Sequence, residues 1–173
     1  MQNELASKSE SSDNNRSQMI ERLIRQYADM IYRIALQNTG NTYDAEDILQ
    51  EVSTALVTGD APLDDPVHLK RWLIRVTINK CRDLYRRNKR IKTEPLENHL
   101  DMPAEEKPSV IEELSRLSEL HRNILYLYYY ENYNIREISE ILRKNINTVR
   151  SGLQRGRKYL KKILTEEENH HEK

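Results

Sequence analysis

The sequence predicts an all-α protein made of two small helical domains joined by a flexible acidic linker. Only four glycines and five prolines occur in 173 residues, too few for the many turns of an all-β chain. Apolar residues recur at intervals of three and four in several segments, the spacing of amphipathic helices. Residues 93–108 contain three prolines in an acidic context, which is typical of a linker between domains.

The first domain is expected over residues 18–92, after a polar N-terminal tail, residues 1–17, that we expect to be disordered. Its first helix is predicted to begin near Ser17 and to end at the turn around Gly40. A second helix is predicted from Asn41 or Thr42, followed by a loop over residues 59–66. The residues expected in the core of these two helices are Ile20, Leu23, Ile24, Tyr27, Met30, Ile31, Ile34, Ala35, Ala45, Ile48, Leu49, Val52 and Leu56.

The third helix, from about Val67 to about Arg90, is strongly basic. The whole chain has no net charge, with 28 basic and 28 acidic residues, but the two signs are segregated along it, so nucleic-acid binding is not excluded. A spacing of four, four, three and four places one set of polar residues on a single stripe, namely Arg71, Arg75, Asn79, Arg82 and Arg86. Cations around one amide suit a nucleic-acid backbone with a single base read by hydrogen bonds. A merely solvated helix face is the alternative.

The second domain is expected over residues 109–164, followed by a tail, residues 165–173. One helix is predicted over residues 110–117, and the next is capped by Ser118. Two further helices read as a helix-turn-helix, in which Asn134 and Glu137 form a capping box and Asn145 caps the last helix. The last helix presents a polar and basic face that suits the major groove of DNA, and a solvated amphipathic helix is again the alternative. That face consists of Arg150, Ser151, Gln154, Arg155 and Lys158.

No metal, cofactor or membrane segment is expected. The single cysteine, Cys81, lies on an apolar stripe and is predicted to pack in the core. His170 and His171 are interpreted as part of a solvated tail, because metal sites need convergent ligands. No apolar run approaches the roughly 18 to 20 residues of a membrane span, and no signal peptide is evident, so a soluble, cytoplasmic protein without direct membrane insertion is expected.

Three motifs resemble one family. They read DAEDILQEV from Asp44, KRWLIRVTINKCRDLYRR from Lys70 and EISEILRKNINTVRSGLQRGR from Glu137. In this order, with an acidic linker between the second and third, they resemble bacterial RNA polymerase sigma factors of the extracytoplasmic function (ECF) group. The resemblance implies that residues 18–92 are sigma region 2 and that residues 109–164 are sigma region 4.

The resemblance also implies roles for individual residues. The second helix would bind the clamp-helix coiled coil of the largest polymerase subunit through Asp44, Asp47, Gln50 and Glu51. Region 2 would recognise and melt the promoter −10 element through Arg71, Arg75, Asn79, Lys80, Arg82 and Arg86, with Asn79 holding one base flipped out of the stack. Region 4 would read the −35 element through Thr148, Arg150, Ser151, Gln154, Arg155 and Lys158.

The implied partners are core RNA polymerase, including subunits beyond the largest, promoter DNA, and an anti-sigma factor that could hold the protein at the membrane. The sequence departs from the family pattern at Gly152, where a basic residue is usual, at Gly156, where alanine is usual, and at Asn132, where glycine is usual. Asn tolerates the left-handed conformation, so we expect the turn at Asn132 to form. Each glycine inside a helix costs about 1 kcal/mol, which predicts a softer recognition helix.

Two other functions are considered. A helix-turn-helix regulator that acts without being a polymerase subunit would leave the first two motifs unexplained. An enzyme with a metal bound by Asp44, Glu46, Asp47 and Glu51 would need a second acidic helix or a histidine partner, which the sequence lacks. No nucleophile-base pair or glycine-rich phosphate loop is apparent, and an enzyme is not expected.

Overall fold

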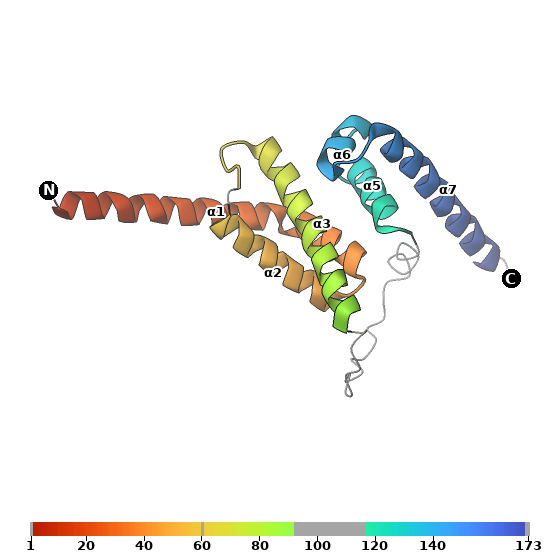
Figure 1. Ribbon diagram of the computed structural model, residues 1–173, viewed down its shortest axis with the longest axis horizontal. Helices are drawn as coiled ribbons and strands as arrows, with labels where there is room; N and C mark the ends of the chain where they lie inside the picture. Colours follow the sequence, from red (N-terminus) through yellow and green to blue (C-terminus); the bar gives the residue numbers. More distant parts are fainter. Residues whose placement is uncertain (1, 60, 92–116, 172–173) are drawn as a thin grey trace.

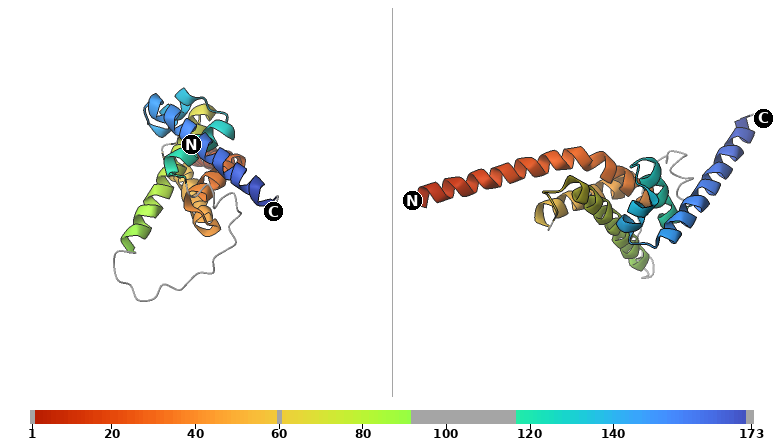
Figure 2. Two further views of the ribbon diagram at one scale, coloured as in Figure 1. Left: turned by 90° about the vertical axis from the view of Figure 1, so that its right-hand side faces the viewer. Right: turned by 90° about the horizontal axis from the view of Figure 1, so that it is seen from above.

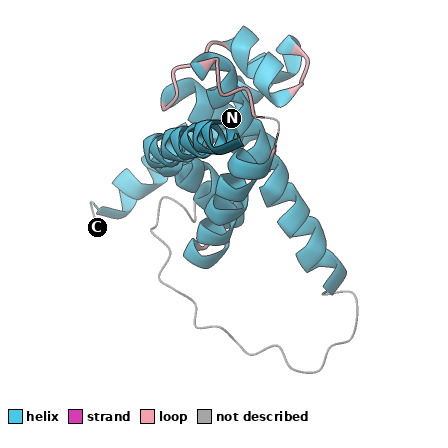
Figure 3. Ribbon diagram, turned by 90° about the vertical axis from the view of Figure 1, so that its left-hand side faces the viewer, coloured by secondary structure: helices cyan, strands magenta, loops and turns pink. Residues whose placement is uncertain are grey.

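A computed structural model describes residues 2–59, 61–91 and 117–171, and within these ranges it consists of helices and their connections without a strand (Figure 3). The helices are α1 (Gln2–Thr39), α2 (Thr42–Thr58), α3 (Pro66–Ile91), α5 (Glu119–Tyr129), α6 (Ile135–Leu142) and α7 (Ile146–His171). Helices α1 to α3 form an N-terminal lobe and α5 to α7 a C-terminal lobe (Figure 1). The predicted all-α class with two helical domains is confirmed. The linker and the helix predicted over residues 110–117 fall almost wholly outside the described residues.

Both ends of the chain are more helical than the sequence predicted. Of the segment expected to be disordered, residues 1–17, the described part belongs to α1, which begins at Gln2. The expected tail after residue 164 continues α7 to His171. Neither extension contains proline or glycine, and adding a residue to an existing helix avoids the cost of nucleating a new one. Figure 2 shows the two ends of the chain projecting in different directions from the packed part of the molecule.

The N-terminal lobe is held by an apolar core between its three helices. Ile34, Ile48 and Leu73 are almost fully buried in it. Gly40, at a φ of 77°, ends α1, and the side chain of Asn41 accepts a hydrogen bond from the backbone N–H of Asp44 at 2.8 Å to cap α2. The predicted connection between the first two helices is therefore confirmed.

Cys81 and the capping residues also follow the sequence prediction, with one difference. Cys81 is buried in the core, and burial raises the pKa of its thiol to about 12. Asn134 and Glu137 form the predicted capping box of α6, and Asn145 accepts a hydrogen bond from the N–H of Asn147 at the start of α7. Ser118 is at the predicted N-cap of α5, but its hydroxyl contacts the ring of His121 at 3.0 Å instead of a backbone N–H.

Two residues of the C-terminal lobe adopt left-handed backbone conformations. Asn132 has a φ of 57°, as its place in the turn before α6 predicted. Arg143, at a φ of 51°, ends α6, and its N–H donates to the carbonyl of Glu140. Arginine is unusual in this conformation, which favours glycine and asparagine.

The two lobes contact each other along two pairs of helices, α1 with α5 and α3 with α6. The contact between α1 and α5 contains a set of hydrogen-bonded amides. Asn123 is only 2% exposed, and its side-chain oxygen accepts hydrogen bonds from the amides of Asn38 at 2.9 Å and Gln37 at 3.3 Å. Its own amide donates to Asn38 at 3.3 Å. We call these three residues the amide cluster.

Candidate nucleic-acid and polymerase interfaces

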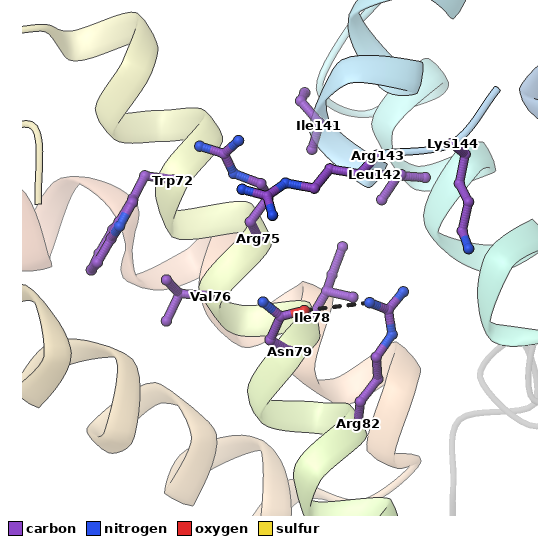
Figure 4. A pocket seen from close by; sticks show the side chains of 10 residues that line it. All are labelled: Trp72, Arg75, Val76, Ile78, Asn79, Arg82, Ile141, Leu142, Arg143 and Lys144. Atoms are coloured by element: carbon purple, nitrogen blue, oxygen red, sulfur yellow. Dashed lines mark hydrogen bonds between the residues drawn. The ribbon is translucent and has the colours of Figure 1, made fainter. Parts of the chain in front are cut away.

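The basic stripe of α3 faces the C-terminal lobe. A cleft of about 400 Å³ separates α3 from the end of α6. Arg75, Asn79 and Arg82 line it from α3, which confirms that these residues share one face of the helix. Arg143 and Lys144 line it from the other side, and the side chain of Arg143 extends from α6 toward α3 (Figure 4). No acidic side chain is among the cleft-lining residues.

Two arginines of this stripe, Arg71 and Arg82, are paired with carboxylates of the C-terminal lobe. Arg71 donates to Glu137 at 3.1 Å and to Glu140 at 3.3 Å. Arg82 donates to Glu119 at 2.7 Å and to the side-chain oxygen of Asn79 at 3.3 Å. These contacts could not be predicted from local sequence patterns, because the partners lie far along the chain. Only the acidic character of the segments around α5 and α6 could have indicated them.

Lys80 and Glu51 lie against each other, not on two separate binding faces. The ammonium group of Lys80 is 2.9 Å from one oxygen of Glu51, and Arg87 donates to the other at 3.2 Å. The hydrogen bond from Lys80 is the main reason that the pKa of Glu51 lies below its usual range. These contacts tie α2 to α3, so both residues already have a structural role. Arg86, also assigned to the stripe, is exposed and pairs with Asp83 at 3.3 Å.

The other acidic and amide residues of α2 differ from Glu51. Asp47 and Gln50 are exposed, where a protein partner can reach them. Asp44 is half-buried, and its carboxylate accepts a hydrogen bond from the Asn41 side chain at 2.7 Å. Asp44 therefore contributes to the start of the helix, as an acid in the first turn of a helix commonly does.

The polar face predicted on the last helix is present on α7. Its members are on the surface, with only Ser151 partly covered; they are Thr148, Arg150, Ser151, Gln154, Arg155 and Lys158. The opposite side of α7 carries Val149 and Leu153, both buried against the rest of the lobe. The exposed side of the helix is thus free of apolar packing and is available to a duplex.

The two glycines of α7 lie where α7 packs against α5. A Cβ atom at Gly152 would be 2.6 Å from the Cδ1 of Ile124, and one at Gly156 would be 2.9 Å from the Cδ1 of Leu125. Ile124 is fully buried and Leu125 nearly so. The glycines therefore permit close approach of the two helices, a role that helix propensity alone does not predict.

Within the described part of the chain, no group of three or more His, Cys, Asp and Glu side chains is arranged to hold a metal ion. The same residues include no helix that is long and apolar enough to cross a membrane.

Two family models match the chain, one to each lobe. Residues 23–91 match the model described as Sigma-70 region 2, and residues 109–160 match Sigma-70, region 4. The chain belongs to the sigma-70 family. The polar stripe of α3 lies within the first match and the exposed face of α7 within the second.

Relatives of known sequence place the protein in the ECF group of this family. It is 35% identical over 157 residues to the ECF RNA polymerase sigma factor SigE of Mycolicibacterium smegmatis, covering 83% of this chain and 61% of that one. It is 29% identical to the ECF RNA polymerase sigma factor SigW of Bacillus subtilis, covering 80% and 84% of the two chains. It is 30% identical to RNA polymerase sigma factor SigZ of Bacillus subtilis, covering 69% and 72%. The protein is an ECF sigma factor, a promoter-specific initiation factor that associates with RNA polymerase.

Solved structures show the same fold. The sigma factor RpoE, in a complex with the anti-sigma factor NepR from Bartonella quintana, superposes with a TM-score of 0.67 at 19% identity, covering 84% of this chain and 96% of that one. CnrH, in a complex with the cytosolic domain of CnrY, gives a TM-score of 0.59 at 20% identity, covering 84% and 87%.

Proposed function

We propose that this ECF sigma factor divides promoter recognition between its two lobes. The stripe of α3 binds the melted −10 strand, with Asn79 holding one extruded base and Arg75 and Arg82 contacting phosphates. The exposed face of α7 reads the −35 duplex in the major groove. The observation that carries this proposal is the pair of basic helical faces, one in each lobe, with Asn79 placed between Arg75 and Arg82 on α3.

Core polymerase binds the exposed part of α2 in this proposal. Asp47 and Gln50 are accessible and suit an arginine-rich partner helix, because carboxylates form strong charge-assisted hydrogen bonds with guanidinium groups. The clamp-helix coiled coil of the largest subunit is the proposed partner. Asp44 and Glu51 support this surface from within, Asp44 by starting α2 and Glu51 by fixing α2 against α3.

An anti-sigma factor is proposed as a further partner, since both structural neighbours described above were solved with a protein bound, in one case a named anti-sigma factor. We place the protein in the cytoplasm, where polymerase and promoter DNA are found, with an anti-sigma factor able to retain it at the membrane. A regulator that acts without polymerase is not favoured, because family models match both lobes.

Charge reversal at Asp47 tests the polymerase surface. Asp47→Arg should weaken binding to core polymerase at least about tenfold, since one interfacial charge pair is lost and a repulsive one is created. Glu46→Arg, at the neighbouring exposed position on the same helix, is the matched control. Affinities measured by fluorescence anisotropy with labelled protein would contradict the proposal if both variants bound as the wild type does.

A further inference from the structure

The C-terminal lobe carries a row of carboxylates that faces the basic helix of the other lobe. Its members are Glu119 at the start of α5, Glu131 after α5, and Glu137 and Glu140 on α6. We propose that this acidic surface competes with promoter DNA for α3, closing the −10 face of the free protein while the −35 face stays open. The inference rests on the proposed function of α3.

The carboxylates meet the stripe at two of its arginines. Glu137 and Glu140 share Arg71, and Glu119 holds Arg82. Along a helix these two arginines are separated by about 16 Å at 1.5 Å per residue. Phosphates bind guanidinium groups through the same hydrogen bonds as carboxylates. A DNA strand and the acidic surface therefore cannot occupy these arginines at the same time.

A third contact, near the start of α3, is the most enclosed. Lys70 is 2.7 Å from Glu131, whose side chain is only 12% exposed. The same carboxyl group accepts a hydrogen bond from the hydroxyl of Tyr126 at 3.0 Å. Burial lowers the pKa of Lys70, but the hydrogen bond and charge of Glu131 outweigh this and leave that pKa raised. Because the pair is shielded from solvent, salt screens it less than a surface pair, which favours the closed arrangement.

The face of α7 is not covered in this way. Arg150, Arg155 and Lys158 are exposed, and among the described residues none of the three forms an ion pair with a carboxylate. The closed protein thus masks one promoter-reading surface and presents the other. Binding of −35 duplex should not require the lobes to separate, whereas binding of the −10 strand should.

Crosslinking the closed form tests the inference in the full-length chain. Arg33 in α1 and Tyr130 after α5 are both exposed and lie close enough across the lobes to interact electrostatically, so Arg33→Cys and Tyr130→Cys together accept a bis-maleimide. Cys81 is buried and should not react. We expect the crosslinked protein to bind a −35 duplex as the unlinked double variant does, and to bind a −10 non-template oligonucleotide at least about tenfold more weakly, because a competing state at high occupancy lowers apparent affinity in proportion.

A second variant opens the lobes instead. Glu119→Gln with Glu140→Gln removes two carboxylate charges and keeps Glu137 in its capping box. We expect about a three- to tenfold gain in affinity for the −10 oligonucleotide, in keeping with the small worth of each partly exposed pair, and no change for the −35 duplex. Glu21→Gln, which removes an exposed carboxylate paired within α1, is the matched control.

Three outcomes would overturn the inference. In the first, the linked protein binds the −10 oligonucleotide as tightly as the unlinked one. In the second, the glutamine variant behaves like its control. In the third, the crosslinks join two chains on a denaturing gel, which would assign the contact to a dimer. Failure of the proposed function is separately visible, because the unlinked variants with core polymerase would then open no promoter.

Discussion

Helices α3 and α7 have similar compositions and different surroundings. Both carry a row of cations and little acid, and both are assigned to promoter DNA. Arg71 and Arg82 of the α3 stripe are paired with carboxylates of the other lobe, whereas the cations on the polar face of α7 are exposed and the opposite side of that helix packs against α5 through two glycines. A basic stripe therefore identifies a helix that binds anions but does not identify the anion bound in a given state.

The largest expected effect distinguishes reading a base from binding a phosphate. Asn79→Ala should reduce discrimination at one −10 position by about 1 to 3 kcal/mol, the usual value of a good base contact. Arg75→Ala should weaken all promoters alike and reduce the salt dependence, because phosphates carry no sequence information. Open-complex assays on single-base −10 variants measure both effects.

Asn88→Ala, at an exposed position near the end of α3, is the control for the Asn79 experiment. Equal losses on every promoter variant would show that Asn79 serves the backbone or the fold. The contrast between a base-reading α3 and a groove-reading α7 would then no longer hold.

A substitution on the side of α7 that packs against α5 tests whether this contact requires glycine. Gly152→Ala should destabilise the protein by about 1 kcal/mol, because overpacking costs about 1 to 3 kcal/mol and the gain in helix propensity is only about 1 kcal/mol. Ile124→Val removes the Cδ1 atom that the new methyl group would meet at 2.6 Å. The double variant should therefore lose less stability than the two single variants together, as measured by urea unfolding.

The exposed Gln154→Ala change is the control for this substitution and should leave stability nearly unaltered. A stabilised Gly152→Ala protein, without coupling to Ile124, would mean that α7 does not need glycine for its contact with α5.

A smaller effect on stability is expected from a substitution at the end of α6. Arg143→Gly should stabilise the protein by up to about 1 kcal/mol, since a non-glycine residue in the left-handed region costs roughly 1 to 2 kcal/mol and the added chain flexibility offsets part of the gain. Lys144→Gly, whose φ is not positive, should destabilise instead. Thermal unfolding of both variants checks the opposite signs.

The smallest expected effect on stability comes from the ion pairs of Glu51, which hold α2 against α3. The pKa of Glu51 is lowered in the folded protein, so the stability from its pairs is present above the ordinary pKa of a glutamate and is lost as the pH falls through the lowered value. At pH 7 Glu51→Gln should cost about 0.2 to 1 kcal/mol, as partly exposed pairs do, and the difference from wild type should vanish in acid. Urea unfolding across this pH range, with the exposed Glu46→Gln as the control, would contradict the assignment if the difference were independent of pH.

Local features of the fold followed from the sequence because their causes are local. The capping box of Asn134 and Glu137, the turn at Asn132 and the caps at Asn41 and Asn145 each depend on residues within a few positions. The buried stripes of α1 and α2 were likewise evident from apolar spacing, although Leu23, Ile24 and Leu49 are only partly buried.

Contacts between distant segments could not be predicted in this way. Lys80 and Glu51 were assigned to different partners, yet they pair with each other, because helical periodicity fixes a residue's face but not the helix that packs against it. The role of Gly152 depends on the position of Ile124 in another helix, and the pairing of Arg71 depends on how the lobes meet. The polar composition of residues 2–17 and 165–171 predicted disorder, although neither segment contains a proline or glycine that would end a helix.

The amide cluster at the contact between α1 and α5 determines what kind of surface is exposed when the two helices separate. When the helices separate, water replaces the hydrogen bonds between Asn38, Gln37 and Asn123 at little cost in free energy. An apolar contact at the same place would be more stable, but its separation would expose an apolar patch of the kind that drives aggregation. The amide cluster, by contrast, exposes polar groups when the two helices separate.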